Sequence, residues 1–447
     1  MRAGNRPDAA RAPSGKASAA VAILFALLVN QGVIYYIAHF SLGSEFLNPW
    51  PVLLATVAAS LVAIGATAVD AKFIRVLFAC LMVSVLFGAT YLWSPSGGYG
   101  LNKTLLTLFV PALCITAGFV VARDGRLRLS LVSGAMLAGL AAIVFTANGH
   151  TPALFAEDER VRSVIITYHN FAFVMALGGL WAIDRLWRRL PRADIWALMC
   201  LLVFVYFIVL SGGRIGLLLV FLTVLIFLWN GTKDRVLAAI LLSACFLVIA
   251  FIAVVLQSYA REIAFSPDVP ATLKRIVLYA FLQREGDVAA GTRDVFHGLA
   301  IEVFLRSPLV GVGWGGFPLA AGLTDTAGNW PHNLVLELMA ETGIIGTMAF
   351  VAFVGLVFYE FIRRRGDVAD KNIILAIFMA GFAASMVGGD WPSQRVLFFG
   401  MGAMTGFSVR YSGPARAAPS CCTQVPGRRD ERSAMSEARS AATARSA

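Results

Sequence analysis

Long apolar segments follow one another along most of the chain, and short polar segments separate them. Each apolar run has about 20 residues, enough for an α-helix to cross a hydrocarbon core about 30 Å thick. The pattern predicts an all-α fold, a polytopic transmembrane helical bundle of about twelve spans. The predicted spans are Ala19–Phe40, Trp50–Val69, Phe73–Leu92, Leu105–Val121, Leu129–Thr146, Asn170–Leu186, Ile195–Leu210, Ile215–Trp229, Val236–Leu256, Gly343–Ile362, Ile373–Val387 and Val396–Arg410.

Composition supports a membrane protein. Of the 447 residues, 58% are hydrophobic and only 14% are charged, whereas a soluble domain has about 25% charged residues. The net charge of +11 would suit nucleic acid, but the arginines lie in short loops between spans. Cytoplasmic loops beside anionic lipids have this distribution. Membrane lipids are therefore expected partners, and nucleic acid is not.

The distribution of basic residues also predicts the orientation. With a cytoplasmic N-terminus, every predicted inside loop is basic, as the positive-inside rule requires. We expect a multi-pass protein of the cytoplasmic membrane with both termini inside and an uncleaved first span. The inside loops carry Lys72, Arg75, Arg123, Arg126, Arg128, Arg185, Arg188, Arg189, Arg192, Lys233, Arg235, Arg363, Arg364, Arg365 and Lys371.

Span positions divide the chain into five predicted segments. They are a basic cytoplasmic segment (1–18), spans one to nine (19–256), a long outer loop (257–342), spans ten to twelve (343–411) and a disordered cytoplasmic tail (412–447). Within the outer loop, apolar residues at helical spacing predict a surface helix at Ala271–Arg284. A second helix, Thr292–Leu305, would present Val295, Phe296, Leu299, Val303 and Phe304. "SPLVGVGWGGFP" predicts a connector rich in turns.

His332 is the first candidate for chemistry. It follows Pro331, a residue favoured at the first position of a helix. We expect His332 and Asn333 in the first turn, where the helix dipole keeps an imidazole neutral and able to accept a proton. Asn333, Glu337 and Glu341 would form one polar stripe, which either assists the histidine or faces water. The alternative for His332 is a capping residue at the lipid headgroups.

Two arginines are further candidates. Arg214, in "LSGGRIG", lies at the outer end of a predicted span, where basic residues are depleted. It either has a partner, beside glycines that let the backbone approach a ligand, or snorkels from a tight loop. Arg293 lies in the outer loop near Asp294 and His297, where an ordinary surface ion pair is the alternative.

Several motifs are missing. There is no GxxxxGK[ST] sequence for a nucleotide, and "GVGWGG" lacks a surrounding βαβ unit. There is no Asp-x-Asp pair to hold a divalent ion on a diphosphate. The six cysteines show neither metal-ligand nor disulfide spacing. We therefore expect no metal and no cofactor.

Taken together, these features resemble the O-antigen ligase and polymerase superfamily of bacterial inner-membrane glycosyltransferases. Its motif is His-Asn, nine residues, Gly, two residues, Gly, and the matching positions are His332, Asn333, Gly343 and Gly346. The other His-Asn pair, His169–Asn170, fails because Leu180 replaces the first glycine. "SGGRIG", with Arg214, and "TRDVFHGLAIEVFLRSPLVGVGWGGF", with Arg293, resemble the arginine segments of the family. Asn170 at the start of a span adds a weaker likeness.

The resemblance implies a function. The donor would be a glycan on undecaprenyl diphosphate at the periplasmic face, and Arg214 and Arg293 would hold its diphosphate. His332 would take the proton of the acceptor hydroxyl, without a metal. The acceptor is lipid A–core for a ligase, which we favour slightly, or a second lipid-linked glycan for a polymerase of O-antigen or exopolysaccharide. A transporter or flippase for a lipid-linked glycan is the rival from another class, but it predicts charges at mid-membrane.

Overall fold

The computed structural model is helical throughout its described part. It describes residues 15–29, 50–66, 69–147, 168–189, 194–211, 214–231, 257–266, 288–326, 328–363, 368–388 and 390–407, besides a few isolated positions. These ranges contain helices and no strand, which confirms the all-α prediction. The elements are α1 (Gly15–Val29), α3 (Trp50–Ala66), α4 (Ala71–Thr90), η1 (Tyr91–Trp93), α5 (Gly98–Arg123), α6 (Leu127–Ala147), α8 (Tyr168–Arg189), α9 (Ile195–Ser211), α10 (Arg214–Gly231), α12 (Ala260–Phe265), α14 (Val288–Arg306), α15 (Phe317–Ala320), α16 (Leu334–Ile362), α17 (Val368–Ser385), η3 (Trp391–Ser393) and α18 (Arg395–Gly406).

Three stretches of the described chain are long and apolar enough to cross a membrane: Ala71–Trp93, Gly98–Arg123 and Leu334–Ile362. They coincide with three predicted spans. Four shorter apolar helices overlap four others: Ser18–Leu27, Leu127–Ile143, Ile195–Val209 and Ile215–Asn230. The total of about twelve spans and the orientation remain predictions. The predicted ninth span, the helix at Ala271–Arg284 and both chain ends fall almost wholly outside the described residues.

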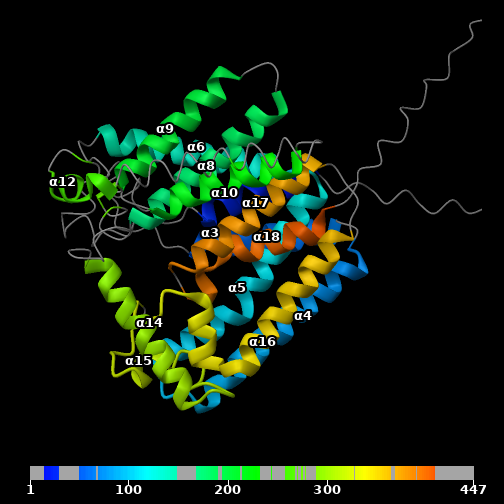
Figure 1. The fold of residues 1–447 in the computed structure, drawn as a ribbon. Coiled ribbons are helices and arrows are strands. Elements are labelled where there is room, and N and C mark those ends of the chain that lie inside the picture. The colour runs from blue at the N-terminus through cyan, green and yellow to red at the C-terminus, as the bar shows by residue number, and fades with distance from the viewer. Residues whose placement is uncertain are drawn as a thin grey trace, which may run out of the picture. The chain divides into compact units, whose positions relative to one another are not determined.

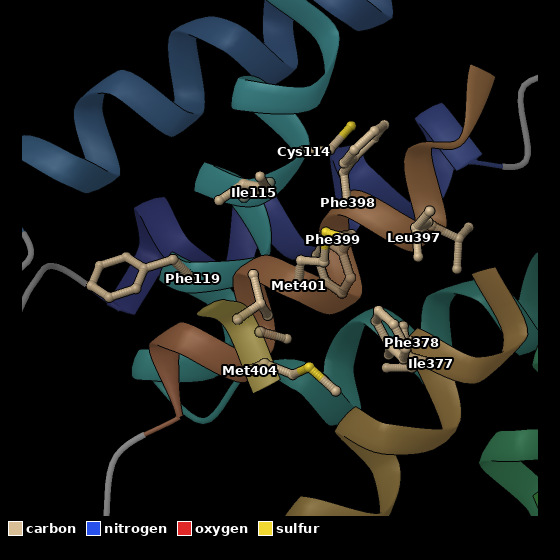
Figure 2. Packing of buried hydrophobic residues seen from close by; sticks show 14 of the residues in the cluster. Cys114, Ile115, Phe119, Ile377, Phe378, Leu397, Phe398, Phe399, Met401 and Met404 are labelled. Carbon is tan, nitrogen blue, oxygen red and sulfur yellow. The ribbon is translucent and has the colours of Figure 1, made fainter. Parts of the chain in front are cut away.

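Helix α18 lies at the centre of the main hydrophobic core. All its residues from Val396 to Gly406 are buried, and its aromatic and methionine side chains meet those of α5 and α17 (Figure 2). Glycines let its backbone approach α5 closely. A Cβ on Gly402 would lie 1.9 Å from the Ile115 carbonyl oxygen, and one on Gly406 would lie 2.2 Å from that of Phe119. Small residues four apart are typical of helix contacts inside membranes.

Helices α4, α5 and α16 run side by side, with α14 and α15 at one end of them (Figure 1). Along α16 the environment changes at Gly343. None of residues 334–343 is exposed, but beyond them an exposed apolar stripe begins: Ile344, Ile345, Met348, Val351, Tyr359 and Ile362. Residues 344–362 measure about 28 Å at 1.5 Å per residue, close to the thickness of a hydrocarbon core. This portion of α16 corresponds to the predicted tenth span, Gly343–Ile362, and residues 334–342 precede it.

The outer-loop predictions hold in part. Helix α14 matches the predicted Thr292–Leu305 helix but begins earlier, at Val288. Val295, one of the five apolar residues that the helix was predicted to present, is 62% exposed and not packed inward. Ala300 instead joins Val303, Phe317 and Ala340 in a small buried cluster. Packing against α15 and α16 selects this face, which the one-dimensional pattern does not show. The glycine-rich connector consists of turns, as predicted.

Candidate active site

The site begins where α16 begins. Asn333 is the N-cap residue, with an extended backbone (φ −149°), and its side-chain oxygen accepts hydrogen bonds from the backbone N–H groups of Val335 and Leu336. The helix therefore starts at Leu334. The prediction that Pro331 occupies the first helical position, with His332 in the first turn, was wrong. The physical reason is that Asn333 satisfies two otherwise unpaired N–H groups only from outside the helix.

His332 adopts a strained backbone conformation just before this cap. Its φ is 55°, and no other non-glycine residue in the described part of the chain has a positive φ. Such conformations cost free energy and tend to occur at functional sites. The imidazole packs edge-on between two aromatic rings. Its ring centre lies 5.7 Å from the ring centre of Phe296 and 5.6 Å from that of Trp330. The backbone and both rings fix its orientation.

The surroundings keep the imidazole neutral. Three causes together lower the pKa of His332 from 6.5 to about 4: burial, which is the largest, then the charge of Arg293 and the nearby His297. The sequence predicted a neutral ring but attributed it to the helix dipole. The main cause is loss of water, followed by a neighbouring cation.

Arg293 reaches this neighbourhood through the packing of α14. The buried cluster of Ala300, Val303, Phe317 and Ala340 joins α14 to α15 and α16. Arg293 lies two turns before Ala300 on α14, half-buried, and close enough to act electrostatically on His332. The fold therefore brings together a guanidinium and an imidazole that are far apart in the sequence.

Two other predicted site residues have no described side chain. Arg214 begins α10, and Asn170 lies in the first turn of α8. Whether Arg214 meets Arg293 and His332 thus stays a prediction, as does any role for Asn170.

Gly343 has a structural role. It interrupts α16 with φ 64° and ψ −165°, a conformation almost restricted to glycine. A Cβ there would lie 2.4 Å from the carbonyl carbon of Leu309. From the opposite side, a Cβ on Gly311, whose φ is 67°, would lie 2.3 Å from the carbonyl carbon of Glu341. Two backbone segments meet here without side chains between them.

Backbone hydrogen bonds join these two segments. The N–H groups of Ile344 and Ile345 donate to the carbonyls of Pro308 and Leu309, at 2.8 and 3.3 Å. In the other direction, the N–H groups of Val312 and Gly313 donate to Ala340 and Glu341 at 3.0 and 2.9 Å. The interruption at Gly343 thus docks the connector that follows α14 onto α16.

Gly346, the last position of the motif, also serves packing. A Cβ on Gly346 would lie 2.1 Å from the Thr342 hydroxyl oxygen and 3.2 Å from the Phe87 ring. Thr342 itself donates a hydrogen bond to the Leu338 carbonyl. Both motif glycines therefore shape the helix that carries the motif histidine at its start.

Glu337 and Glu341 neither face water nor reach toward solvent. Both carboxylates are 1% exposed, and each has an oxygen 2.6 Å from the ammonium of Lys103, which is 0% exposed. The alternative that these glutamates face water was wrong, because their spacing places them against α5. Sequence analysis overlooked Lys103. Two features of the sequence could have indicated it: a lysine close to a long apolar run, and two acidic residues on an apolar helix, which require a cation as partner.

Two hydrogen bonds attach the turn between α4 and α5 to the outer loop. Asp325 accepts hydrogen bonds from the Ser96 hydroxyl at 2.6 Å and from the Gly97 N–H at 3.0 Å. The sequence pattern gave no signal for Asp325, which lies in an irregular segment.

No group of three or more His, Cys, Asp or Glu side chains within the described ranges could hold a metal ion. Metal independence therefore remains a prediction.

One comparison with known proteins identifies a domain. Residues 197–351 match the O-antigen ligase family, and this segment runs from α9 into α16 and includes Arg214, Arg293 and the whole His332 motif. A comparison with curated proteins gives no match. The resemblance found in the sequence is confirmed for this segment: residues 197–351 form an O-antigen ligase domain, in a chain with helices long and apolar enough to span a membrane.

Proposed function

We propose that the chain transfers a glycan from undecaprenyl diphosphate to an acceptor hydroxyl at the periplasmic face of the inner membrane. The observation that carries the proposal is the packing of α14 against His332. The Phe296 ring centre lies 5.7 Å from that of the imidazole, and the charge of Arg293, about one turn earlier on α14, lowers the pKa of the histidine. A cation beside a neutral, fixed imidazole suits a reaction in which a hydroxyl loses a proton while a phosphate gains charge.

The position of the site along α16 supports this location. The exposed apolar stripe begins at Ile344, and His332 lies on the other side of the Gly343 interruption, beyond the spanning length. By the positive-inside rule, the basic loops favour a cytoplasmic location for the opposite face. A lipid-linked donor in the outer leaflet would present its diphosphate at this level, with the glycan in the aqueous phase.

In the proposed reaction, the acceptor oxygen attacks the anomeric carbon of the donor glycan and the carbon–oxygen bond to the diphosphate breaks. His332 takes the hydroxyl proton, and the bonding electron pair leaves with the diphosphate. Arg293 and Arg214 offset the charge that builds there, because guanidinium groups match phosphate oxygens in a bidentate geometry. Attack from the face opposite the leaving group would invert the anomeric centre.

Donor binding would also make His332 a stronger base. In the unbound protein, Arg293 helps to hold the pKa of His332 near 4. A bound diphosphate would offset that positive charge, and the pKa would rise. The base would thus gain strength only when the donor is present.

For the acceptor we favour lipid A–core, as in a ligase, with polymerisation of lipid-linked repeat units as the second candidate. A deletion strain separates the two on a gel of its lipopolysaccharide and secreted polysaccharide. Unmodified core with accumulated lipid-linked polymer indicates a ligase, whereas single repeat units on core indicate a polymerase.

The central test replaces His332 with alanine in membranes supplied with lipid-linked donor and acceptor. Glycan transfer should disappear while donor binding persists. Arg306→Ala is the matched control, since this exposed arginine of α14 pairs with Glu302 away from the histidine. Transfer that survives in His332→Ala would contradict the proposal, and a lipid-linked glycan that still crosses the membrane would favour a transporter.

A further inference from the structure

The outer portion of α16, Leu334–Thr342, needs an anchor of its own. A continuous helix would transmit the position of the spanning portion to its outer end. The non-helical backbone at Gly343 interrupts that transmission. The outer portion must therefore be held by contacts from its sides, and it carries the Asn333 cap and His332 at its start.

Lys103 is at the centre of those lateral contacts. Its ammonium, on α5, lies 2.6 Å from carboxylate oxygens of both Glu337 and Glu341. The oxygen of Glu341 that it contacts also accepts the Gly315 N–H at 2.9 Å, and that of Glu337 accepts the Trp391 N–H at 3.2 Å. One ammonium thus joins α5, the outer portion of α16, the connector after α14 and η3.

Aromatic packing fixes Lys103 itself. Its ammonium lies 4.4 Å from the centre of the Trp314 ring, and the Trp314 indole N–H donates to the Thr107 hydroxyl at 3.0 Å. Trp314 also stacks on Phe87. The cation is thereby held by α5 and by the connector, and it has little freedom to follow a moving glutamate.

The carboxylates depend on this one cation. Glu337 Oε2 and Glu341 Oε1 are buried and have no hydrogen-bond partner among the described residues. Without Lys103, two buried carboxyl groups would face each other with only backbone N–H groups as partners, an arrangement proteins avoid. The two glutamates would then move apart or admit water.

A short path leads from this cluster to the histidine. The Glu337 N–H donates to the Asn333 carbonyl at 2.9 Å, and Asn333 directly follows His332. Any displacement of Glu337 therefore reaches the cap and the strained residue before it.

We propose that Lys103 is a positioning residue, which holds the outer portion of α16, and with it His332, in place by binding both Glu337 and Glu341. The inference rests on the proposed function for its kinetic consequence, but not for its structural one.

The experiment uses the full chain in native membranes and two variants of the cluster. Lys103→Met removes the cation. Lys103→Met/Glu337→Gln/Glu341→Gln removes all three charges, and it supplies the test if the single variant fails to assemble. The matched control is Lys72→Met/Arg75→Met. These two residues pair with Glu360, which is equally buried at the opposite end of α16.

Two measurements are made on each variant. The first is the rate at which diethyl pyrocarbonate acylates His332, followed by residue-resolved mass spectrometry. The second is transfer kinetics. Both Lys103 variants should acylate faster, because the imidazole leaves its aromatic enclosure. Their kcat should fall by about 10- to 100-fold, the effect of a displaced catalytic group, with the KM for donor unchanged. The control should match the wild type in both.

The acylation rate requires no transfer reaction, so it tests the position of His332 even if the proposed function fails. Wild-type acylation rates in both Lys103 variants would overturn the inference. An equal increase in the control would do so as well, since it would show general loosening of α16.

Discussion

The backbone of Gly343 lies against that of Leu309 so closely that no side chain fits between them, and a Cβ on Gly343 would sit 2.4 Å from the Leu309 carbonyl carbon. This contact joins the connector after α14 to α16 at the point where α16 changes direction. Arg293 lies on α14, which leads into this connector, and His332 directly precedes the Asn333 cap of α16.

Gly343→Ala should therefore destabilise the protein. The alanine would have to adopt φ 64° with ψ −165°, which costs about 1–3 kcal/mol, and its Cβ would push the connector away. We expect a lower melting temperature in detergent, measured by tryptophan fluorescence, and loss of transfer.

The control for this change is Gly355→Ala on the same helix, where a Cβ would meet nothing within 4 Å. Alanine favours the helix there by up to about 1 kcal/mol relative to glycine. The melting temperature should therefore stay the same or rise. Equal destabilisation by both variants would show that the interruption of α16 at Gly343 does not contribute to stability.

Arg293→Gln should raise the pKa of His332. The wild-type pKa is about 4, and Arg293 is one cause of the lowering. Removing the cation makes the imidazolium less unfavourable, so the pKa moves up toward its ordinary value of 6.5. The midpoint of the pH dependence of His332 acylation measures it, because only the neutral ring reacts.

Arg306→Gln, on the exposed side of α14, should leave that midpoint unchanged. A midpoint that does not move in Arg293→Gln would mean that the guanidinium does not act on the imidazole, and the proposed site would lose its central pairing.

Donor should shift the pH dependence of transfer in the same direction. The acid limb of kcat/KM reports the unbound enzyme, whereas that of kcat reports the donor complex. Because a diphosphate offsets the charge of Arg293, the kcat limb should lie at the higher pH. Initial rates from pH 4 to 8 at limiting and saturating donor give both limbs. Coincident limbs would argue against a diphosphate beside Arg293.

Asp325→Ala should loosen the turn between α4 and α5. The carboxylate accepts hydrogen bonds from Ser96 and Gly97, and hydrogen bonds to a charged group contribute about 1.5–3 kcal/mol each. We expect a lower melting temperature and faster proteolysis at this turn. Asp325→Asn keeps one acceptor oxygen, so its melting temperature should fall less than that of Asp325→Ala. Equal decreases would show that the remaining acceptor oxygen does not hold the turn.

Sequence analysis recovered the candidate site in part, and the misses share a cause. His332 stands out because a histidine is unusual in an apolar stretch, whereas Arg293 and the motif glycines stand out through the family resemblance. Lys103 was missed because its two partners lie far along the chain, on a helix that meets α5 only after folding. Asp325 was missed because a single acid in an irregular segment carries no periodic signal.

By itself, the sequence determined that apolar segments of this protein suit a lipid bilayer, and that their secondary structure is helical. Apolar runs in a bilayer must satisfy their backbone groups internally, and a helix does so within one segment. It also marked the histidine motif, because the spacing of His332, Asn333, Gly343 and Gly346 resembles that of the O-antigen ligase family. Only the tertiary structure decided which side chains meet: the cation that serves Glu337 and Glu341, the face of α14 that packs inward, and the placement of Arg293 beside His332. Those outcomes depend on contacts between segments far apart in the chain, where close packing and the burial of charge select one arrangement.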